Sequence, residues 1–298
     1  MNAAGVSISA KALLLAALAL LAGFFLLAWW AAIRRAGSRF ADAVPGPVAI
    51  AIGALTDFLD TLGIGSFATT TSLFKLGRLL PDEEIPGTLN IGHAVPTFAE
   101  AFIFIAVVDV EMKTLASMVA ASAIGAWFGA GVVVGWSRRK IELGMGILLI
   151  FAGAIMVARQ TGLVPGGGTA LGLEGPRLAI GIAGNLVLGA LMTLGIGLFA
   201  PCMILIALLG MNQATAFPIM MGSCAFLMPA GNFRFLRSGR YNLRAAVGLT
   251  LGGLPAVLIA ALIVKQLPLA WVKWLVVGVV VYTAIAMLRS AARGRKNA

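Results

Sequence analysis

Two near-identical octapeptides contain the residues best suited to binding a small anion. Residues 61–68 read TLGIGSFA and residues 193–200 read TLGIGLFA, so seven of eight positions agree at a spacing of 132 residues. Glycine lets a ligand approach the backbone closely, and a helix that restarts after the glycines exposes unpaired N–H groups and the positive end of its dipole. We therefore predict a two-part anion site with the substrate-binding residues Thr61, Gly63, Gly65, Ser66, Thr193, Gly195 and Gly197.

Ionisable residues lie before and after the first octapeptide at helical spacing. Asp57 and Asp60 are three residues apart and share one helix face. A polar stripe farther along spans an arc of about 80° on an otherwise apolar helix, and it comprises Asn90, His93, Thr97 and Glu100. We assign proton coupling or gating to Asp57, Asp60, His93 and Glu100, and substrate binding to Asn90, His93 and, in the second half, Ser223. The alternative is that these carboxylates only solvate a wet cavity. As anions beside an anion site they would repel substrate unless protonated.

The sequence offers little for metal or cofactor chemistry. The chain has one histidine and two distant cysteines, Cys202 and Cys224, both within apolar stretches. This is not a zinc-ligand pattern, and two small buried residues explain the cysteines. No GxxxxGK[ST] motif occurs. We expect no metal, no cofactor and no enzymatic activity, because one histidine is a poor basis for an intramembrane enzyme.

Composition points to a lipid environment. Apolar residues make up 60% of the chain, charged residues only 11%, and the mean hydropathy is +1.01. A soluble domain carries about a quarter charged residues. The net charge of +11 comes from short basic clusters between apolar runs, which is typical of cytoplasmic loops and not of nucleic-acid binding. The expected partners are therefore the lipid bilayer and a small anion, with no nucleic acid; a homodimer is left open.

The apolar runs predict the elements that position these residues. A first helix over 12–33 is too long for the apolar core of a signal peptide and ends at Arg34. The runs 44–74 and 178–210 are too long for one ordinary helix, and both contain a glycine break. The other expected spans are 86–108, 115–136, 141–158, 214–231, 245–264 and 269–288.

Charge determines the expected topology. If each long run is a hairpin of two half-helices, every basic cluster faces the cytoplasm, whereas single crossings would place Arg138, Arg139 and Lys140 outside. The prediction is an all-α polytopic membrane protein with two inverted-topology repeats, each with a re-entrant broken-helix hairpin and about three crossings, plus an extra N-terminal helix. The expected divisions are the N-terminal helix with its basic loop (1–43), the first repeat (44–158), an external linker (159–177), and the second repeat with a basic cytoplasmic tail (178–298).

The paired glycine breaks, the repeat layout and the short basic loops resemble the sulfite exporter TauE/SafE family over residues 44–288. The resemblance implies a permease for sulfite or a small organosulfonate, often acting outward. We expect a secondary transporter of the cell inner membrane, with its N-terminus outside, its C-terminus in the cytoplasm, and proton coupling as an option. A passive anion channel and a carrier for another small anion, such as a carboxylate, remain alternatives. Glycines that only allow close helix packing are the simpler explanation of one motif, but the duplication favours a site.

Overall fold

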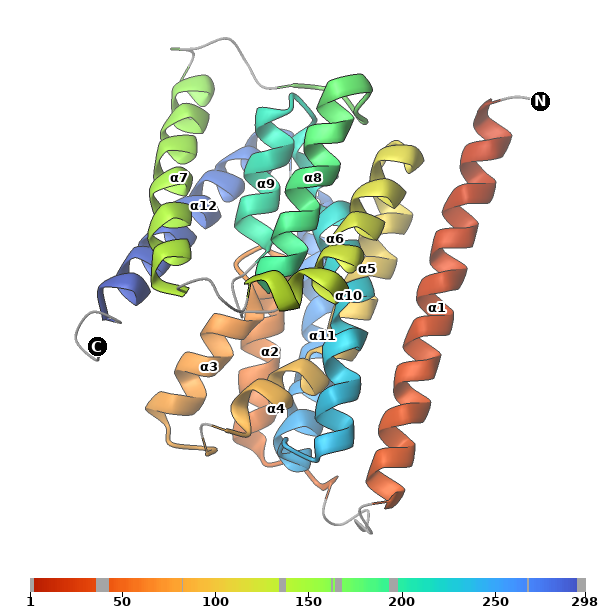
Figure 1. Ribbon diagram of the computed structural model, residues 1–298, viewed down its shortest axis with the longest axis vertical. Coiled ribbons are helices and arrows are strands. Elements are labelled where there is room, and N and C mark those ends of the chain that lie inside the picture. Colours follow the sequence, from red (N-terminus) through yellow and green to blue (C-terminus); the bar gives the residue numbers. More distant parts are fainter. Residues whose placement is uncertain are drawn as a thin grey trace. The chain divides into compact units, whose positions relative to one another are not determined.

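The computed structural model describes residues 3–35, 43–81, 83–133, 138–161, 163, 168–192, 198–266 and 268–293. These residues are almost wholly helical, and among them the only β-type pairing is an isolated bridge between Ala170 and Met211. The elements, shown in Figure 1, are α1 (Ala3–Arg35), α2 (Pro47–Thr61), α3 (Ser66–Leu76), α4 (Ile85–Gly92), α5 (Ala94–Val107), α6 (Met112–Val133), α7 (Arg138–Gln160), α8 (Gly175–Met192), α9 (Phe199–Leu208), the 3₁₀ turn η2 (Gln213–Thr215), α10 (Ala216–Ser238), α11 (Leu243–Gln266) and α12 (Leu269–Arg293).

Five helical stretches within the described residues are long and apolar enough to cross a membrane. They are Ala10–Arg35, Ile85–Val107, Gly175–Met192, Gln213–Ser238 and Leu243–Val264. Shorter apolar stretches lie in α6, α9 and α12. The predicted all-helical class is thus confirmed for the described residues, and the five stretches are consistent with a multi-pass membrane protein. The predicted span over 86–108 consists of two helices with His93 between them.

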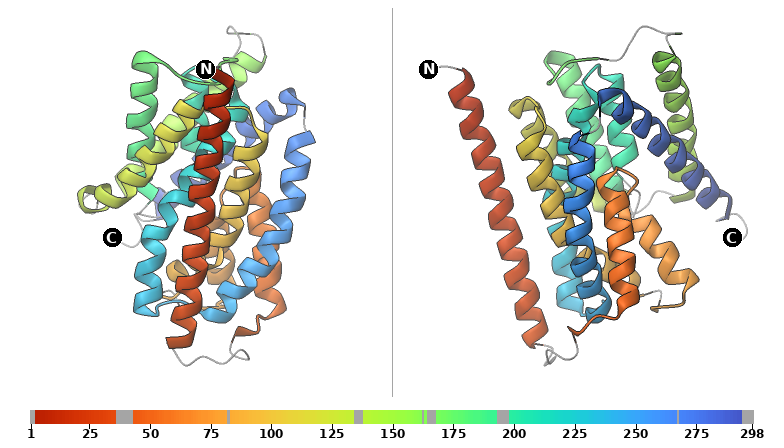
Figure 2. Two further views of the ribbon diagram at one scale, coloured as in Figure 1. Left: turned by 90° about the vertical axis from the view of Figure 1, so that its right-hand side faces the viewer. Right: turned by 180° about the vertical axis from the view of Figure 1, so that it is seen from behind.

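Helix α1 exposes large apolar side chains on one face and buries aromatic ones on the other. Leu20 and Leu27 are 76% and 68% exposed, whereas Phe25 is fully buried. The Phe25 ring packs against Phe98 of α5, and Phe24 packs against Phe233. The views in Figure 2 agree that α1 runs along the outside beside α5. Such exposed leucines are unfavourable in water and favourable in a lipid bilayer.

The described chain separates into two compact units that do not follow the two sequence halves. Unit 1 comprises Met1–Val107 and Cys224–Lys265, and unit 2 comprises Val108–Ser223 and Gln266–Ala298. Each unit therefore draws on both predicted repeats. A repeat describes descent in the sequence, whereas a compact unit describes which segments pack together, so the two divisions need not coincide.

Close backbone packing between α2 and α11 organises unit 1. A Cβ atom at Gly53 would lie 2.4 Å from the carbonyl oxygen of Leu249, and one at Gly252 would lie 1.9 Å from that of Ile50. Only glycine permits such contact. A buried apolar cluster then joins these helices to α3 and α4, and it comprises Ile52, Phe74, Ile85, Leu89, Ala245 and Leu249.

Unit 2 uses the same packing between α6 and α8. A Cβ atom at Gly125 would lie 1.9 Å from the carbonyl oxygen of Leu186, and one at Gly189 would lie 2.1 Å from that of Ser122. The buried Asn185 side chain donates to the carbonyl oxygen of Met118 at 2.7 Å and to Ser223 Oγ at 2.8 Å. Small residues and interhelical hydrogen bonds together thus fix this pair of helices.

Candidate functional site

The first octapeptide forms the break between α2 and α3. The N–H of Gly63 donates to the carbonyl oxygen of Asp60 at 2.7 Å, and the N–H of Ile64 donates to that of Leu59 at 3.0 Å. This pair of bonds is a Schellman motif, which needs a left-handed residue at its turn, and Gly63 has φ 93°. Gly63 is therefore explained by the way α2 ends, and α3 then turns back beside α2 (Figure 1).

Helix α3 begins without a side-chain cap of its own. Its N-cap residue is Gly65, with φ 89° and ψ 128°, a conformation that essentially only glycine adopts. The missing acceptor comes from α2, because the N–H of Ser66 donates to Asp60 Oδ1 at 2.6 Å. A carboxylate therefore occupies the positive end of α3, and both residues are buried.

A chain of buried polar side chains continues from α2. His93 Nδ1 lies 2.7 Å from Asp57 Oδ1, and His93 Nε2 lies 3.0 Å from Thr70 Oγ1 on α3. All three side chains are fully buried. His93 occupies the junction of α4 and α5, where Thr250 of α11 donates to the carbonyl oxygen of Gly92 at 2.7 Å. The imidazole ring of His93 thus lies between α2 and α3, and the carbonyl oxygen of Gly92 stays paired through its bond with Thr250.

Glu100 joins this network through Thr61. Thr61 Oγ1 lies 2.7 Å from Glu100 Oε1 and 2.8 Å from the carbonyl oxygen of Asp57. A hydroxyl group has only one hydrogen to donate. Thr61 can donate fully to only one of the two oxygens, so both contacts are strong hydrogen bonds when Thr61 donates to the backbone and a protonated Glu100 donates to Thr61. The geometry therefore favours a neutral Glu100 in this conformation.

This assignment predicts that Glu100→Gln is well tolerated. The glutamine amide can donate to Thr61 as the protonated acid does, so the free energy of unfolding should change by about 1 kcal/mol or less. Glu100→Ala removes the donor and opens a cavity, and should cost more. Unfolding of the purified protein in detergent measures both variants. A Glu100→Gln protein as unstable as Glu100→Ala would show that Glu100 is ionised.

Three polar atoms of this cluster are buried and have no hydrogen-bond partner among the described residues. They are Asp57 Oδ2, Glu100 Oε2 and Ser66 Oγ. Asp57 Oδ2 faces α11, where a Cβ atom at Gly253 would lie 1.9 Å from it. Buried polar groups are normally paired. A group of three such atoms at one place indicates capacity for protons, water or a polar ligand.

The structure brings together most of the residues predicted for the first half. Asp57, Asp60, Thr61, Ser66, His93 and Glu100 lie in one buried cluster of unit 1, and Thr97 is also buried. Asn90 does not join it, because its amide donates to the carbonyl oxygen of Pro86 at 2.8 Å on its own helix. Ser223 lies in unit 2, paired with Asn185. Thr193, Gly195 and Gly197 lie outside the described residues.

Two contributors to these networks were not predicted from the sequence. Thr70 lies within a run of four hydroxyl residues, 69–72, and nothing in that run distinguishes the one that reaches His93. Asn185 is the only amide within the apolar α8, and that was a usable signal. Among the described residues, no group of three histidine, cysteine or acidic side chains is arranged to hold a metal ion.

The break itself can be tested at Gly65. Nothing lies within 4 Å of a Cβ atom built on Gly65, so the effect of Gly65→Ala must come from its backbone conformation. We expect a loss of about 1–3 kcal/mol in the free energy of unfolding. Gly46→Ala is the matched control, since Gly46 caps α2 at φ −77° and also has open space. Equal stability of the two variants would contradict the strain at Gly65.

Comparisons with protein-family models, curated proteins and solved structures gave no match to this chain.

Proposed function

We propose that this protein is a secondary transporter that moves a small anion across the cell inner membrane, with the anion held at the N-terminus of a broken helix. The resemblance to the sulfite exporter TauE/SafE family supports sulfite or a small organosulfonate as the substrate, and export as the direction. The repeat of the first octapeptide at 193–200 supports a second, equivalent half-site and inverted-topology halves with two re-entrant hairpins.

One observation supports the proposal above the others. The N-terminus of α3, placed by a glycine break between apolar helices, holds a carboxylate through a 2.6 Å bond from the Ser66 N–H to Asp60. A carboxylate and a sulfonate or sulfite ion present the same kind of acceptor oxygen to such a donor. This helix end therefore has the stereochemistry to bind an oxyanion.

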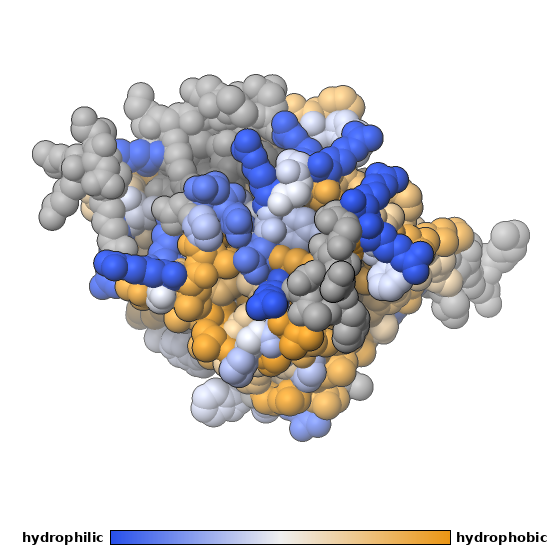
Figure 3. All heavy atoms as spheres, turned by 90° about the horizontal axis from the view of Figure 1, so that it is seen from below, coloured by the Kyte–Doolittle hydropathy of each residue, from blue (hydrophilic) through white to orange (hydrophobic). Residues whose placement is uncertain are grey.

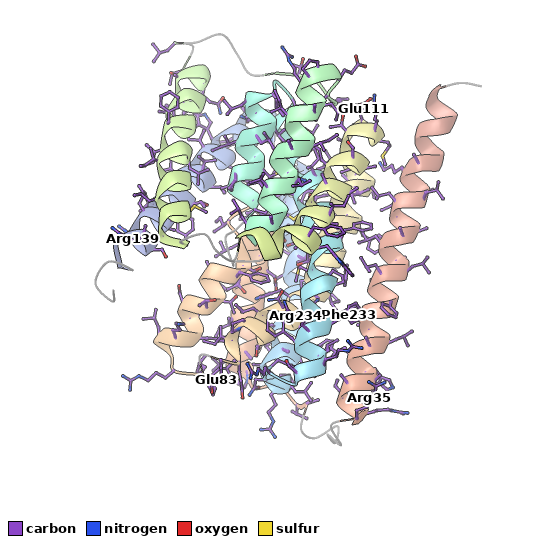
Figure 4. All side chains as sticks on the ribbon, in the orientation of Figure 1. Arg35, Glu83, Glu111, Arg139, Phe233 and Arg234 are labelled. Atoms are coloured by element: carbon purple, nitrogen blue, oxygen red, sulfur yellow. The ribbon has the colours of Figure 1, made fainter. Side chains whose placement is uncertain are left out.

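Basic side chains gather at one end of unit 1, where anions would approach. Helices α1, α3 and α10 end there and α11 begins there (Figure 1), and the exposed basic residues at these termini are Arg34, Arg35, Lys75, Arg78, Arg237, Arg240 and Arg244. Figure 3 views this end and shows hydrophilic residues at several points of it, and Figure 4 places Arg35 and Glu83 there. By the positive-inside rule this end is cytoplasmic, with the N-terminus outside.

A pocket at this end is a candidate entrance. It has a volume of about 470 Å³ and is lined by Lys75, Arg78, Leu79, Leu80 and Pro81 at the end of α3. Arg78 has φ 48°, a conformation that costs a residue with a side chain roughly 1–2 kcal/mol. Two cations beside an open pocket concentrate anions by their field.

The decisive test is transport by the purified protein in proteoliposomes. We expect saturable uptake of labelled sulfite that competes with small sulfonates and is driven uphill by a pH gradient. Uptake that is neither saturable nor concentrative would identify a passive channel. Competition by carboxylates but not sulfonates would reassign the substrate class, and a folded protein that moves none of these anions would refute the proposal.

A further inference from the structure

We propose that Asp60 is a tethered competitor of the transported anion, whose carboxylate occupies the N-terminus of α3 until protonation releases this N-terminus for substrate. The inference rests on the proposed function and specifies how a proton is coupled to it. It starts from an observed contact, the 2.6 Å hydrogen bond from the Ser66 N–H to Asp60 Oδ1, between residues that are 1% and 4% exposed.

A helix N-terminus can hold one anion favourably, but not two at the same place. Its unpaired N–H groups and dipole correspond to only about half a positive charge. With Asp60 ionised, an arriving anion meets a like charge a few ångströms away, in surroundings where such repulsion is strong. Protonation removes the charge and weakens the bond from the Ser66 N–H, because a neutral carboxyl oxygen is a poorer acceptor than a carboxylate, so an anionic substrate can compete for the same donor.

The surrounding atoms show that a ligand can be satisfied at this place. Ser66 Oγ, in the first turn of α3, is buried and has no hydrogen-bond partner among the described residues. Asp57 Oδ2 on α2 and Glu100 Oε2 on α5 are likewise buried and unpaired among these residues. A hydroxyl group donates well to an oxyanion, and so does a protonated carboxyl group. The cluster therefore contains unused donor capacity that does not depend on Asp60.

Among the titratable groups of the cluster, Asp60 carries the charge that no neighbouring group balances. On its own helix it faces Asp57, which pairs with His93 from the α4–α5 junction at 2.7 Å. From α5 it faces Glu100, which the Thr61 geometry favours as neutral. The described parts of α3 and α11 at this point contribute Ser66, Thr70 and Gly253, none of which titrates here. We take His93 as protonated and paired with Asp57 across their 2.7 Å contact, so that one proton on Asp60 neutralises the group and one proton is bound per anion.

The experiment measures proton uptake on anion binding, and its probe is methanesulfonate, which stays ionised throughout the pH range used. Calorimetric titration of the detergent-purified full chain in buffers of different ionisation enthalpy gives the number of protons taken up. We expect about one proton per sulfonate bound, and an affinity that falls about tenfold for each unit of rising pH once Asp60 is ionised.

Asp60→Asn is the matching variant, because asparagine is also a favourable N-cap and so retains the α2–α3 connection, while its neutral amide oxygen, like that of a protonated Asp60, competes with an anion more weakly than a carboxylate does. It should bind methanesulfonate without proton uptake and with equal affinity at about pH 6 and pH 8. In proteoliposomes it should exchange anions but no longer accumulate them against a gradient when driven by pH. Thr56→Val is the control, since Thr56 is buried one turn before Asp60 and its hydroxyl donates to the carbonyl oxygen of Ile52 on its own helix. It should behave as the natural protein does.

Each outcome supports or overturns either the competitor role of Asp60 or the proposed function. Binding by the natural protein without proton uptake overturns the inference, even if Asp60→Asn fails to fold, and so does a variant with an unchanged pH dependence. Binding by Asp60→Asn at a pH where the natural protein binds nothing supports it strongly. If neither protein binds or moves methanesulfonate or sulfite at any pH, the proposed function itself fails. If the anions move in a manner independent of Asp60, only the competitor role fails.

Discussion

His93→Ala should lower the free energy of unfolding by about 3–5 kcal/mol, the loss typical of breaking a buried ion pair by removing one partner. His93 Nδ1 is 2.7 Å from Asp57 Oδ1, and both side chains are fully buried. Without the imidazole ring, the Asp57 carboxyl group has no partner at either oxygen, since Oδ2 is already unpaired among the described residues. Unfolding in detergent, followed by circular dichroism, measures the loss.

A double-mutant cycle separates this pairing from simple loss of volume. Asp57→Asn in the His93→Ala background removes the charge that the first substitution leaves unpaired. The two changes together should therefore cost less than the sum of the single changes, by about 0.5–3 kcal/mol. His93→Asn retains a donor near the position of Nδ1 and should lose less than His93→Ala. Strictly additive costs would show that the two groups do not interact.

Gly252→Ala should be the most damaging of the small substitutions in α11. Its Cβ atom would lie 1.9 Å from the carbonyl oxygen of Ile50 and 2.8 Å from the backbone nitrogen of Ala54. Backbone atoms cannot rotate away, so α2 and α11 must separate. We expect a loss of about 3 kcal/mol, at the upper end for an overpacked core. Transport should fall with it, because α2 carries Asp57 and Asp60.

The control for this prediction is a glycine with open space in another helix. Gly23 of α1 and Gly278 of α12 have nothing within 4 Å of a Cβ atom. Alanine at either position should stabilise the protein by roughly 0.5–1 kcal/mol, because alanine loses less backbone freedom than glycine on entering a helix. If Gly252→Ala were as stable as these variants, the close contact of α2 with α11 would be wrong.

The His93 and Gly252 predictions both concern the packing of α11 against α2. Gly253, next to Gly252, brings the backbone of α11 against Asp57 Oδ2, so the packing of the helices also sets the surroundings of the carboxylate. A change that moves α11 should therefore alter stability and the pH dependence of transport together. Gly23→Ala and Gly278→Ala should leave both the rate and the pH dependence of transport unchanged. They therefore serve as controls for His93→Ala and Gly252→Ala.

The sequence by itself determined the helical, apolar class of protein and the position of its first break. Composition and apolar runs are sufficient for this, because a helix in lipid must be long, apolar and internally hydrogen-bonded. The glycines at 63 and 65 placed the first break correctly, since few other residues adopt the positive φ found there. The helix face shared by Asp57 and Asp60 also followed from spacing alone. Spacing grouped Asn90 with His93, but the Asn90 amide donates to the carbonyl oxygen of Pro86 on its own helix and does not join the buried cluster.

Only the tertiary structure decided which of these groups meet and what each one holds. Asp57 and Asp60 look equivalent in the sequence, yet one pairs with His93 and the other caps α3. The partners come from segments up to 39 residues away, as in Thr61 and Glu100, and no local pattern encodes such a distance. The physical reason is that helix periodicity determines the direction in which a side chain points, whereas the packing of small residues between helices determines what it reaches.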